Sequence, residues 1–148
     1  MNNPLDLNID VKDVSTAMPR LAENEYICSI KSATVEENKA KTGNNLVVVF
    51  ATTEEAEDQN GEPLGAGIQV RKYYPLQQSS NERAPDFRRD LTILVDAAFN
   101  IDEAHNRPTI TNETLAQLVG EEVSVRVRLR ESDQYGLQNE IARISAIG

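Results

Sequence analysis

Five segments of the chain show the apolar and β-branched patterns that are typical of β-strands. The clearest is Glu122–Arg130, in which four apolar residues alternate with one serine and three arginines, so that one face is apolar and the other basic. Leu46–Thr52 is a continuous apolar run, which predicts a strand that is buried on both faces. The other predicted strands are Tyr26–Val35, Ile68–Pro75 and Asn139–Ile147. Within Tyr26–Val35, the apolar positions change from one face of the strand to the other, which predicts a β-bulge near Lys31–Ser32.

Two segments have helical rather than strand periodicity. In Asp86–Phe99, apolar residues recur at steps of three and four, as on one face of an amphipathic helix. Asp86 stands at its start, where a carboxylate caps the helix or complements its dipole. A second, short helix is predicted at Asn112–Leu118, with Thr111 as its cap and its end before Gly120.

The remaining segments divide the chain into an arm and one domain. Residues 1–22 alternate polar and apolar side chains without a firm period and contain Pro4 and Pro19, so we expect an extended N-terminal arm. Residues 23–148 are expected to form the domain. Within it, Thr53–Gly67 is rich in acids and glycine; a solvated loop is the favoured interpretation, and a divalent-cation site is the alternative.

The order of the predicted elements is three strands, a helix, a short helix and two strands. This order predicts a mainly β fold: a five-stranded, OB-like Greek-key barrel with an α-helix between strands three and four. Closure of a barrel also removes exposed strand edges, which a small sheet otherwise has to protect. An open antiparallel sheet, or a sandwich with the helix packed outside, remains the alternative.

Composition excludes several classes of protein. The 148 residues carry a net charge of −9, which discourages indiscriminate binding to phosphate backbones but allows a local basic strip. The single cysteine, Cys28, lies in an apolar run and is expected to be a small buried hydrophobe, and His105 is expected in a loop, so no metal, cofactor or catalytic triad is predicted. The chain has neither a signal-peptide pattern nor an apolar run long enough to span a membrane, so we expect a cytoplasmic binding protein and not an enzyme.

Binding of a nucleic-acid single strand requires cations that follow the phosphates and aromatic faces on which bases stack. The third predicted strand offers both. Ile68 and Val70 share the parity of Lys72 and Tyr74, so Arg71 and Tyr73 are expected to point outward. Tyr73 then provides a stacking surface, or alternatively packs under a loop.

Other candidate nucleic-acid ligands lie on the remaining strands and turns. Arg126, Arg128 and Arg130 (the arginine row) recur at every second position, about 6.5 Å apart, a spacing suited to successive phosphates. The alternative is a solvated strand face paired with acids such as Glu140. Three lysines on or after the first strand and one tyrosine at the tip of the last turn complete the set: Lys31, Lys39, Lys41 and Tyr135.

Several turn and strand motifs together resemble bacteriophage single-stranded DNA-binding proteins with an OB-like barrel. The likeness spans roughly residues 22–147 and lies in Glu25-Tyr26-Ile27, Lys41–Phe50, Leu118–Val125 and Gly136–Ile141. The resemblance implies non-specific binding and protection of single strands during phage replication or recombination in the host cytoplasm. It also implies partners among replication or recombination proteins. The apolar C-terminus departs from the acidic tail by which many such proteins recruit partners.

Two other functions fit the same sequence. A small, acidic, β-rich domain with an extended arm also suits a structural or decoration protein of the virion. An acidic protein-interaction module that mimics nucleic acid is the third class, and the net charge of −9 favours it. Exposed strand edges are compatible with a homo-oligomer.

Overall fold

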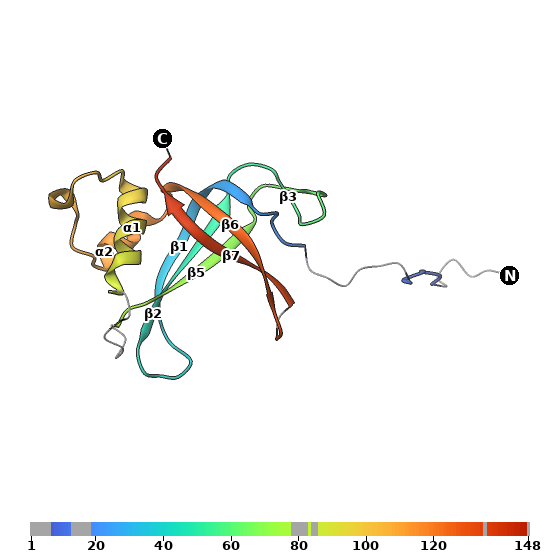
Figure 1. The fold of residues 1–148 in the computed structure, drawn as a ribbon, viewed down its shortest axis with the longest axis horizontal. Coiled ribbons are helices and arrows are strands. Elements are labelled where there is room, and N and C mark those ends of the chain that lie inside the picture. Colours follow the sequence, from blue (N-terminus) through green and yellow to red (C-terminus); the bar gives the residue numbers. More distant parts are fainter. Residues whose placement is uncertain (1–6, 13–18, 78–82, 84–85, 135, 148) are drawn as a thin grey trace.

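The computed structural model describes residues 7–12, 19–77, 83, 86–134 and 136–147, and within them the chain is mainly β. Five long strands form one antiparallel sheet in the order β5-β2-β1-β6-β7 (Figure 1). Their bounds are β1 Asn24–Glu37, β2 Asn44–Thr52, β5 Gln69–Pro75, β6 Glu122–Ser132 and β7 Gly136–Ser145. All five predicted strands are therefore confirmed, with ends shifted by a few residues.

The central strand, β1, pairs with β2 along one part of its length and with β6 along the other. Its register with β2 shifts between Ile30 and Ser32, which confirms the predicted bulge. Lys31 consequently has no partner residue on β2. A bulge bends its strand and increases the local twist, which helps the sheet to curl around the core.

A closed barrel, which the sequence pattern predicted, is not formed. The edge strands β5 and β7 approach each other, but no backbone ladder joins them within the described residues. Side chains from both edges and from the helix α1 (Arg88–Phe99) line a pocket at this opening, among them Tyr74, Ile93 and Ile144.

The core lies between the inner face of the sheet and the two helices. Strand β2 is buried from Leu46 to Thr52, as predicted for its continuous apolar run. Val123, Val125 and Val127 of β6 are buried as well, which confirms the alternation read from that strand. Cys28 lies in the same core, where burial raises the pKa of its thiol to about 11, so it is the buried small hydrophobe that was expected.

Figure 1 shows α1 and α2 (Asn112–Leu118) on the same side of the sheet. The Thr111 hydroxyl accepts the Thr114 backbone N–H, and the Thr114 hydroxyl accepts the Thr111 backbone N–H in return. The predicted cap is therefore confirmed. In the described ranges no helix has the length and apolar character needed to cross a lipid bilayer.

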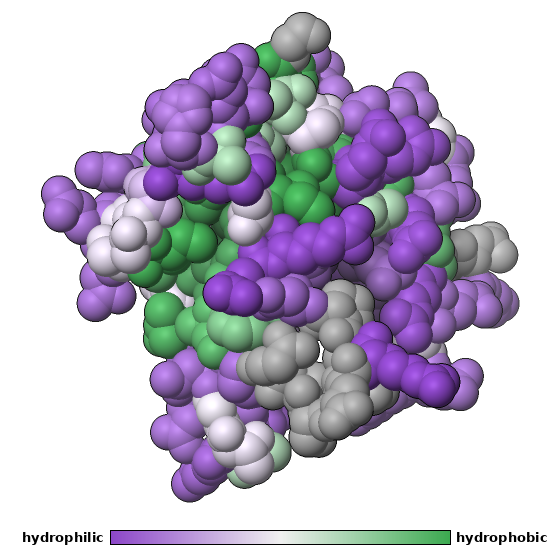
Figure 2. Space-filling model, turned by 60° about the vertical axis from the view of Figure 1, so that its left-hand side comes forward, coloured by the Kyte–Doolittle hydropathy of each residue, from purple (hydrophilic) through white to green (hydrophobic). Residues whose placement is uncertain are grey.

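Figure 2 shows apolar surface among hydrophilic groups on the helix side of the molecule. Two exposed apolar side chains, Val35 and Ile110, line a hollow between the helices and the sheet.

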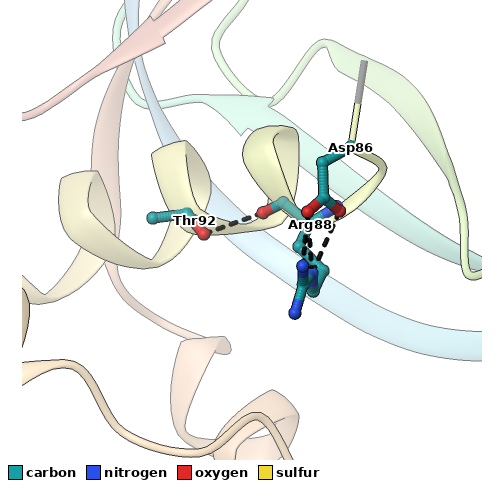
Figure 3. Close-up of polar contacts among 3 residues, drawn as sticks. All are labelled: Asp86, Arg88 and Thr92. Atoms are coloured by element: carbon teal, nitrogen blue, oxygen red, sulfur yellow. Dashed lines mark hydrogen bonds and ion pairs between the residues drawn. The ribbon is translucent and has the colours of Figure 1, made fainter. Parts of the chain in front are cut away.

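The start of α1 is fixed by Asp86. Its carboxylate accepts the Arg88 backbone N–H at 3.0 Å and also forms an ion pair with the Arg88 guanidinium (Figure 3). One turn further on, the Thr92 hydroxyl donates to the Arg88 carbonyl oxygen at 2.7 Å. The N-cap residue is Phe87, whose side chain forms no cap, so Asp86 stands one residue before the cap position and supplies a negative charge at the helix start.

Protonation of Asp86 should occur at unusually low pH. Its hydrogen bonds from Arg88 lower the pKa of the carboxyl group from 3.8 to about 2. Because the folded-state pKa is depressed, the stabilising contribution is complete above the unfolded-state value and is lost as the pH falls through about 2. An NMR titration should show this midpoint, and Arg88→Ala should raise it towards the ordinary value, with the backbone N–H of residue 88 still lowering the pKa. Arg107→Ala, which removes a cation bound to Asp96 instead, is the control; a wild-type midpoint near the ordinary value would contradict the prediction.

The acidic segment after β2 forms a small hairpin of β3 (Ala56–Glu57) and β4 (Pro63–Leu64). Asp58 is buried in its turn, and its carboxylate accepts the backbone N–H groups of Asn60 and Glu62. In the described part of the chain no group of three His, Cys, Asp or Glu side chains could hold a metal ion. His105 lies in the 3-10 turn η1 (Ala104–Asn106) and is exposed.

The last residues of the predicted arm are attached to the domain. Leu21 is fully buried in the core, and it forms an isolated bridge with Asp58. The Asn139 side chain accepts the Leu21 N–H and donates to the Leu21 carbonyl, both at 2.9 Å. The Arg20 guanidinium donates to the Leu137 carbonyl. The chain therefore enters the domain beside β7.

Candidate nucleic-acid interface

Strand β5 has the orientation that its sequence predicted. Val70 and Tyr74 are buried, whereas Arg71 and Tyr73 are exposed on the opposite side of the strand. Tyr73 is 56% exposed on this edge strand. Of the two interpretations of Tyr73, a stacking surface is therefore favoured over a ring packed beneath a loop.

Arg71 and Tyr73 belong to a surface that crosses three strands. In register, Tyr73 lies beside Val47 and Thr34, and Arg71 lies beside Val49 and Ser32. A third row contains Ser29 of β1, Ala51 of β2 and Gln69 of β5. We call this surface the outer patch, and its nine members are Ser29, Ser32, Thr34, Val47, Val49, Ala51, Gln69, Arg71 and Tyr73.

The centre of the outer patch is apolar. Val47 and Val49 are almost fully buried, yet they do not belong to the main core cluster, because they point to the other side of β2. Their neighbours on β1 and β5 cover them on both sides. The sequence pattern identified β2 as buried on both faces but did not place these two valines in the outer patch. The signal for them was the continuous apolar run, because every second residue of such a strand points to the outer side of the sheet.

None of the nine side chains of the outer patch is a carboxylate, although the protein as a whole carries a charge of −9. The nearest acids by register lie at its borders, Glu36 at one end of β1 and Glu122 on β6 beside Ser29. Within the described residues, Arg71 forms no ion pair. The patch therefore presents a ring and an unneutralised guanidinium where anions are not repelled by an adjacent carboxylate.

The three predicted lysines lie at two places beside this surface. Lys31 is exposed at the bulge of β1, next to Ser32. Lys39 and Lys41 are exposed in the loop between β1 and β2. This loop has a defined shape, because the Asn38 carboxamide accepts the Thr42 N–H and the Asn38 N–H binds the Gly43 carbonyl. All three ammonium groups are free of ion pairs in the part of the chain that the structure describes.

The arginine row is exposed on β6, as its alternation predicted, but it is partly neutralised. Arg128 and Arg130 both approach the Glu140 carboxylate of β7, at 3.2 and 3.6 Å. Arg126 lies in register between Glu25 and Arg143, and these two form an ion pair with each other at 3.5 Å. Exposed pairs of this kind contribute little free energy, so they do not prevent an exchange of carboxylate for phosphate.

The structure does not bring the arginine row together with Arg71 and Tyr73. Two strands, β2 and β1, separate β5 from β6, a lateral distance of about 14 Å. Along the strands, Arg71 is level with Ser32 of β1, whereas Arg126 is level with Glu25, roughly 23 Å further along. The two sets therefore share the outer side of the sheet as separate areas. The last predicted ligand, Tyr135, lies outside the described residues.

The outer patch has the chemistry for a flat or extended ligand that carries negative charge. No deep cleft is required, because an exposed ring binds by stacking and an exposed guanidinium by charge. No protein-family model matches the chain, and no curated protein sequence matches it. Function is therefore inferred from the geometry and the charge of the described residues.

Proposed function

We propose that the protein binds single-stranded DNA without sequence specificity, and that the outer patch is its principal contact surface. The observation that carries this proposal is the exposed Tyr73 ring beside the unpaired Arg71, within a carboxylate-free area of a strongly acidic protein. Solubility alone does not explain such a ring, because a polar residue at position 73 would serve that purpose better.

In the proposed complex, a base stacks on the Tyr73 ring, a contact worth about 1–3 kcal/mol. Arg71 binds the adjacent phosphate, and the Lys31, Lys39 and Lys41 ammonium groups extend the positive path towards the β1–β2 loop. Val47 and Val49 are buried between these side chains, so they support the surface and do not contact the strand themselves. None of these contacts reads a base edge in a defined geometry, so binding is expected to be non-specific.

The proposal includes a finer assignment of the fold as OB-like. In support, β1 lies between β2 and β6, and the chain order of the five long strands and α1 is that expected for this fold. In OB-like domains, the face of strands two and three and the first loop bind oligonucleotides. Here these correspond to β2, β5 and the loop that carries Lys39 and Lys41. The resemblance to phage single-stranded DNA-binding proteins adds a role in replication or recombination, without catalysis.

A fluorescence-anisotropy titration with labelled oligo-dT at several salt concentrations tests the proposal. We expect saturable binding with a log–log salt slope of about −3, since four free cations each release about 0.7 counterions per phosphate. Arg71→Gln should flatten this slope by about 0.7. Arg88→Gln is the matched control, because it removes an equal charge from α1, which packs on the other side of the sheet. Absence of saturable binding, or an Arg71 variant identical to the wild type, would contradict the proposal.

Oligonucleotide length tests the contribution of the arginine row. Because the row lies roughly 23 Å along the sheet from Arg71, a short oligonucleotide on the outer patch cannot reach it. The double variant Arg126→Gln, Arg128→Gln should therefore weaken binding of a long oligo-dT and leave that of a short one unchanged. Equal losses for both lengths would place the principal contact surface at the row instead.

A structural role in a virus particle is the second candidate, and the arm favours it. Leu7, Ile9 and Val11 are exposed at alternate positions, a pattern suited to adding an extended segment to a neighbouring subunit. Co-sedimentation with particles, without binding to oligo-dT, would identify this role. Deletion of residues 1–18 would then abolish co-sedimentation, whereas it should leave oligo-dT binding intact if the outer patch is the site.

A further inference from the structure

The opening between the two edge strands contains a pocket that no part of the proposed interface uses. It has a volume of about 470 Å³ and is bounded by β5, β7 and the first half of α1. We call it the seam pocket. The side chains that matter here are Lys72, Tyr74, Arg89, Ile93, Ile141 and Arg143. Because alternate residues of β5 point to opposite sides, Lys72 and Tyr74 face this pocket while Arg71 and Tyr73 face the outer patch.

Tyr74 forms part of the wall of the seam pocket, and its hydroxyl lies buried behind that wall. The residue is only 2% exposed, and its hydroxyl has no hydrogen-bond partner among the described residues. Buried hydroxyl groups are nearly always bonded, because an unpaired one loses its water without compensation. Burial, and then the nearby Asp90 carboxylate, raise the pKa of Tyr74, so the phenol stays protonated and remains a donor.

The charge around this donor is positive. The Lys72 ammonium lies over the Tyr74 ring, 5.3 Å from its centroid, and Arg89 and Arg143 line the same pocket. Asp90 is the one acid in the lining. Arg143 has an exposed partner, Glu25, at 3.5 Å, whereas Lys72 and Arg89 form no ion pair within the described residues. Two unpaired cations, Lys72 and Arg89, against one carboxylate among the described lining residues favour an anion.

The rest of the lining is apolar, which limits the kind of anion. Ile93 is 39% exposed at the pocket, and Ile141 lines it from β7. Apolar walls with a few convergent polar groups, in a volume of several hundred Å³, are typical of sites for small organic ligands. A bare inorganic ion would leave these walls uncovered.

We propose that the seam pocket binds a phosphate monoester with an apolar or aromatic body of about one nucleotide in size. The phosphate lies between Lys72 and Arg89, and the body packs against Ile93 and Ile141. This site is independent of the outer patch, because the two lie on opposite sides of β5. A free nucleotide and the 5′-phosphorylated end of a DNA strand present the same chemistry.

Calorimetry or NMR titration of the full chain with thymidine 5′-monophosphate tests the inference. We expect saturable binding, with thymidine and inorganic phosphate each at least about tenfold weaker, since each lacks one half of the ligand. Arg89→Ala and Lys72→Ala should each lower the affinity about tenfold, as expected for loss of a hydrogen bond to a charged group. Arg88→Ala, the neighbouring arginine that is bound to Asp86, should leave the affinity unchanged.

Thermal unfolding without ligand provides an independent readout. Because Tyr74→Phe removes an unpaired buried hydroxyl, its melting temperature should equal or exceed that of the wild type. Nucleotide binding by this variant should equal that of the wild type, because the hydroxyl does not reach the pocket. Absence of saturable nucleotide binding, or binding that Arg89→Ala and Lys72→Ala leave unchanged, would overturn the inference.

Two further comparisons separate the ligand sources and the two sites. Tighter binding of 5′-phosphorylated than of unphosphorylated oligo-dT, abolished by Arg89→Ala, would assign the pocket to strand ends; equal binding of the two would assign it to free nucleotides. Tyr73→Ala should leave nucleotide binding intact. Failure of the outer patch as a DNA site therefore does not affect this test, and failure of the seam pocket does not affect the outer patch.

Discussion

Tyr73→Ala should weaken binding of oligo-dT by about 1–3 kcal/mol, the largest loss expected from any single side chain of the outer patch. The reason is geometric: Tyr73 is the one ring of the patch, and more than half of its surface is open to a ligand. Stacking is largely independent of charge, so the salt slope of binding should stay close to that of the wild type. Anisotropy titrations at two salt concentrations would measure both quantities together.

Tyr73→Phe is the matched control, because it keeps the ring and removes the hydroxyl. It should retain most of the affinity if stacking is the contact. Since Tyr73 lies on the outer side of the sheet, neither variant should change the melting temperature by much. An equal loss in both variants would point to a hydrogen bond from the hydroxyl, and no loss in either would remove the outer patch as the binding surface.

Alternation within a strand was enough to orient the candidate residues of β5 and β6. The apolar positions of β6 are buried and its three arginines are exposed, and on β5 the shared parity of Val70 and Tyr74 placed Arg71 and Tyr73 outward. The bulge in β1 was also predictable, because a phase change in apolar positions has no other simple explanation in a paired strand. These features depend only on residues that are close together in the sequence, so they can be predicted from it.

Relations between strands were not predictable in the same way. The distance between Arg71 and the arginine row follows from strand order and register, which join residues far apart in the chain. The open seam is a relation between the first and last edge strands of the sheet, so the pattern of elements predicted closure where no ladder joins the described residues. Lys72, Arg89 and Arg143 come from three elements, and no spacing in the sequence indicates that they line one pocket.

Leu94→Ala should lower the free energy of unfolding by about 2–5 kcal/mol, the largest stability effect that we expect from a single substitution in α1. Leu94 is fully buried in the core, where α1 packs against β6 and β7 beside the open seam. Truncation removes apolar contacts and leaves a cavity in the core. Chemical denaturation should show a lower midpoint.

The adjacent residue supplies the matched comparison for that experiment. Ile93 lies on the same helix but is 39% exposed, so Ile93→Ala should cost less than half as much as Leu94→Ala. Since α1 packs on the inner side of the sheet and the outer patch lies on the other side, the folded Leu94 variant should bind oligo-dT with wild-type affinity. Equal destabilisation by both substitutions would mean that α1 does not pack through its buried face, whereas loss of DNA binding in a folded Leu94 variant would mean that the helix side of the domain, and not the outer patch, holds the strand.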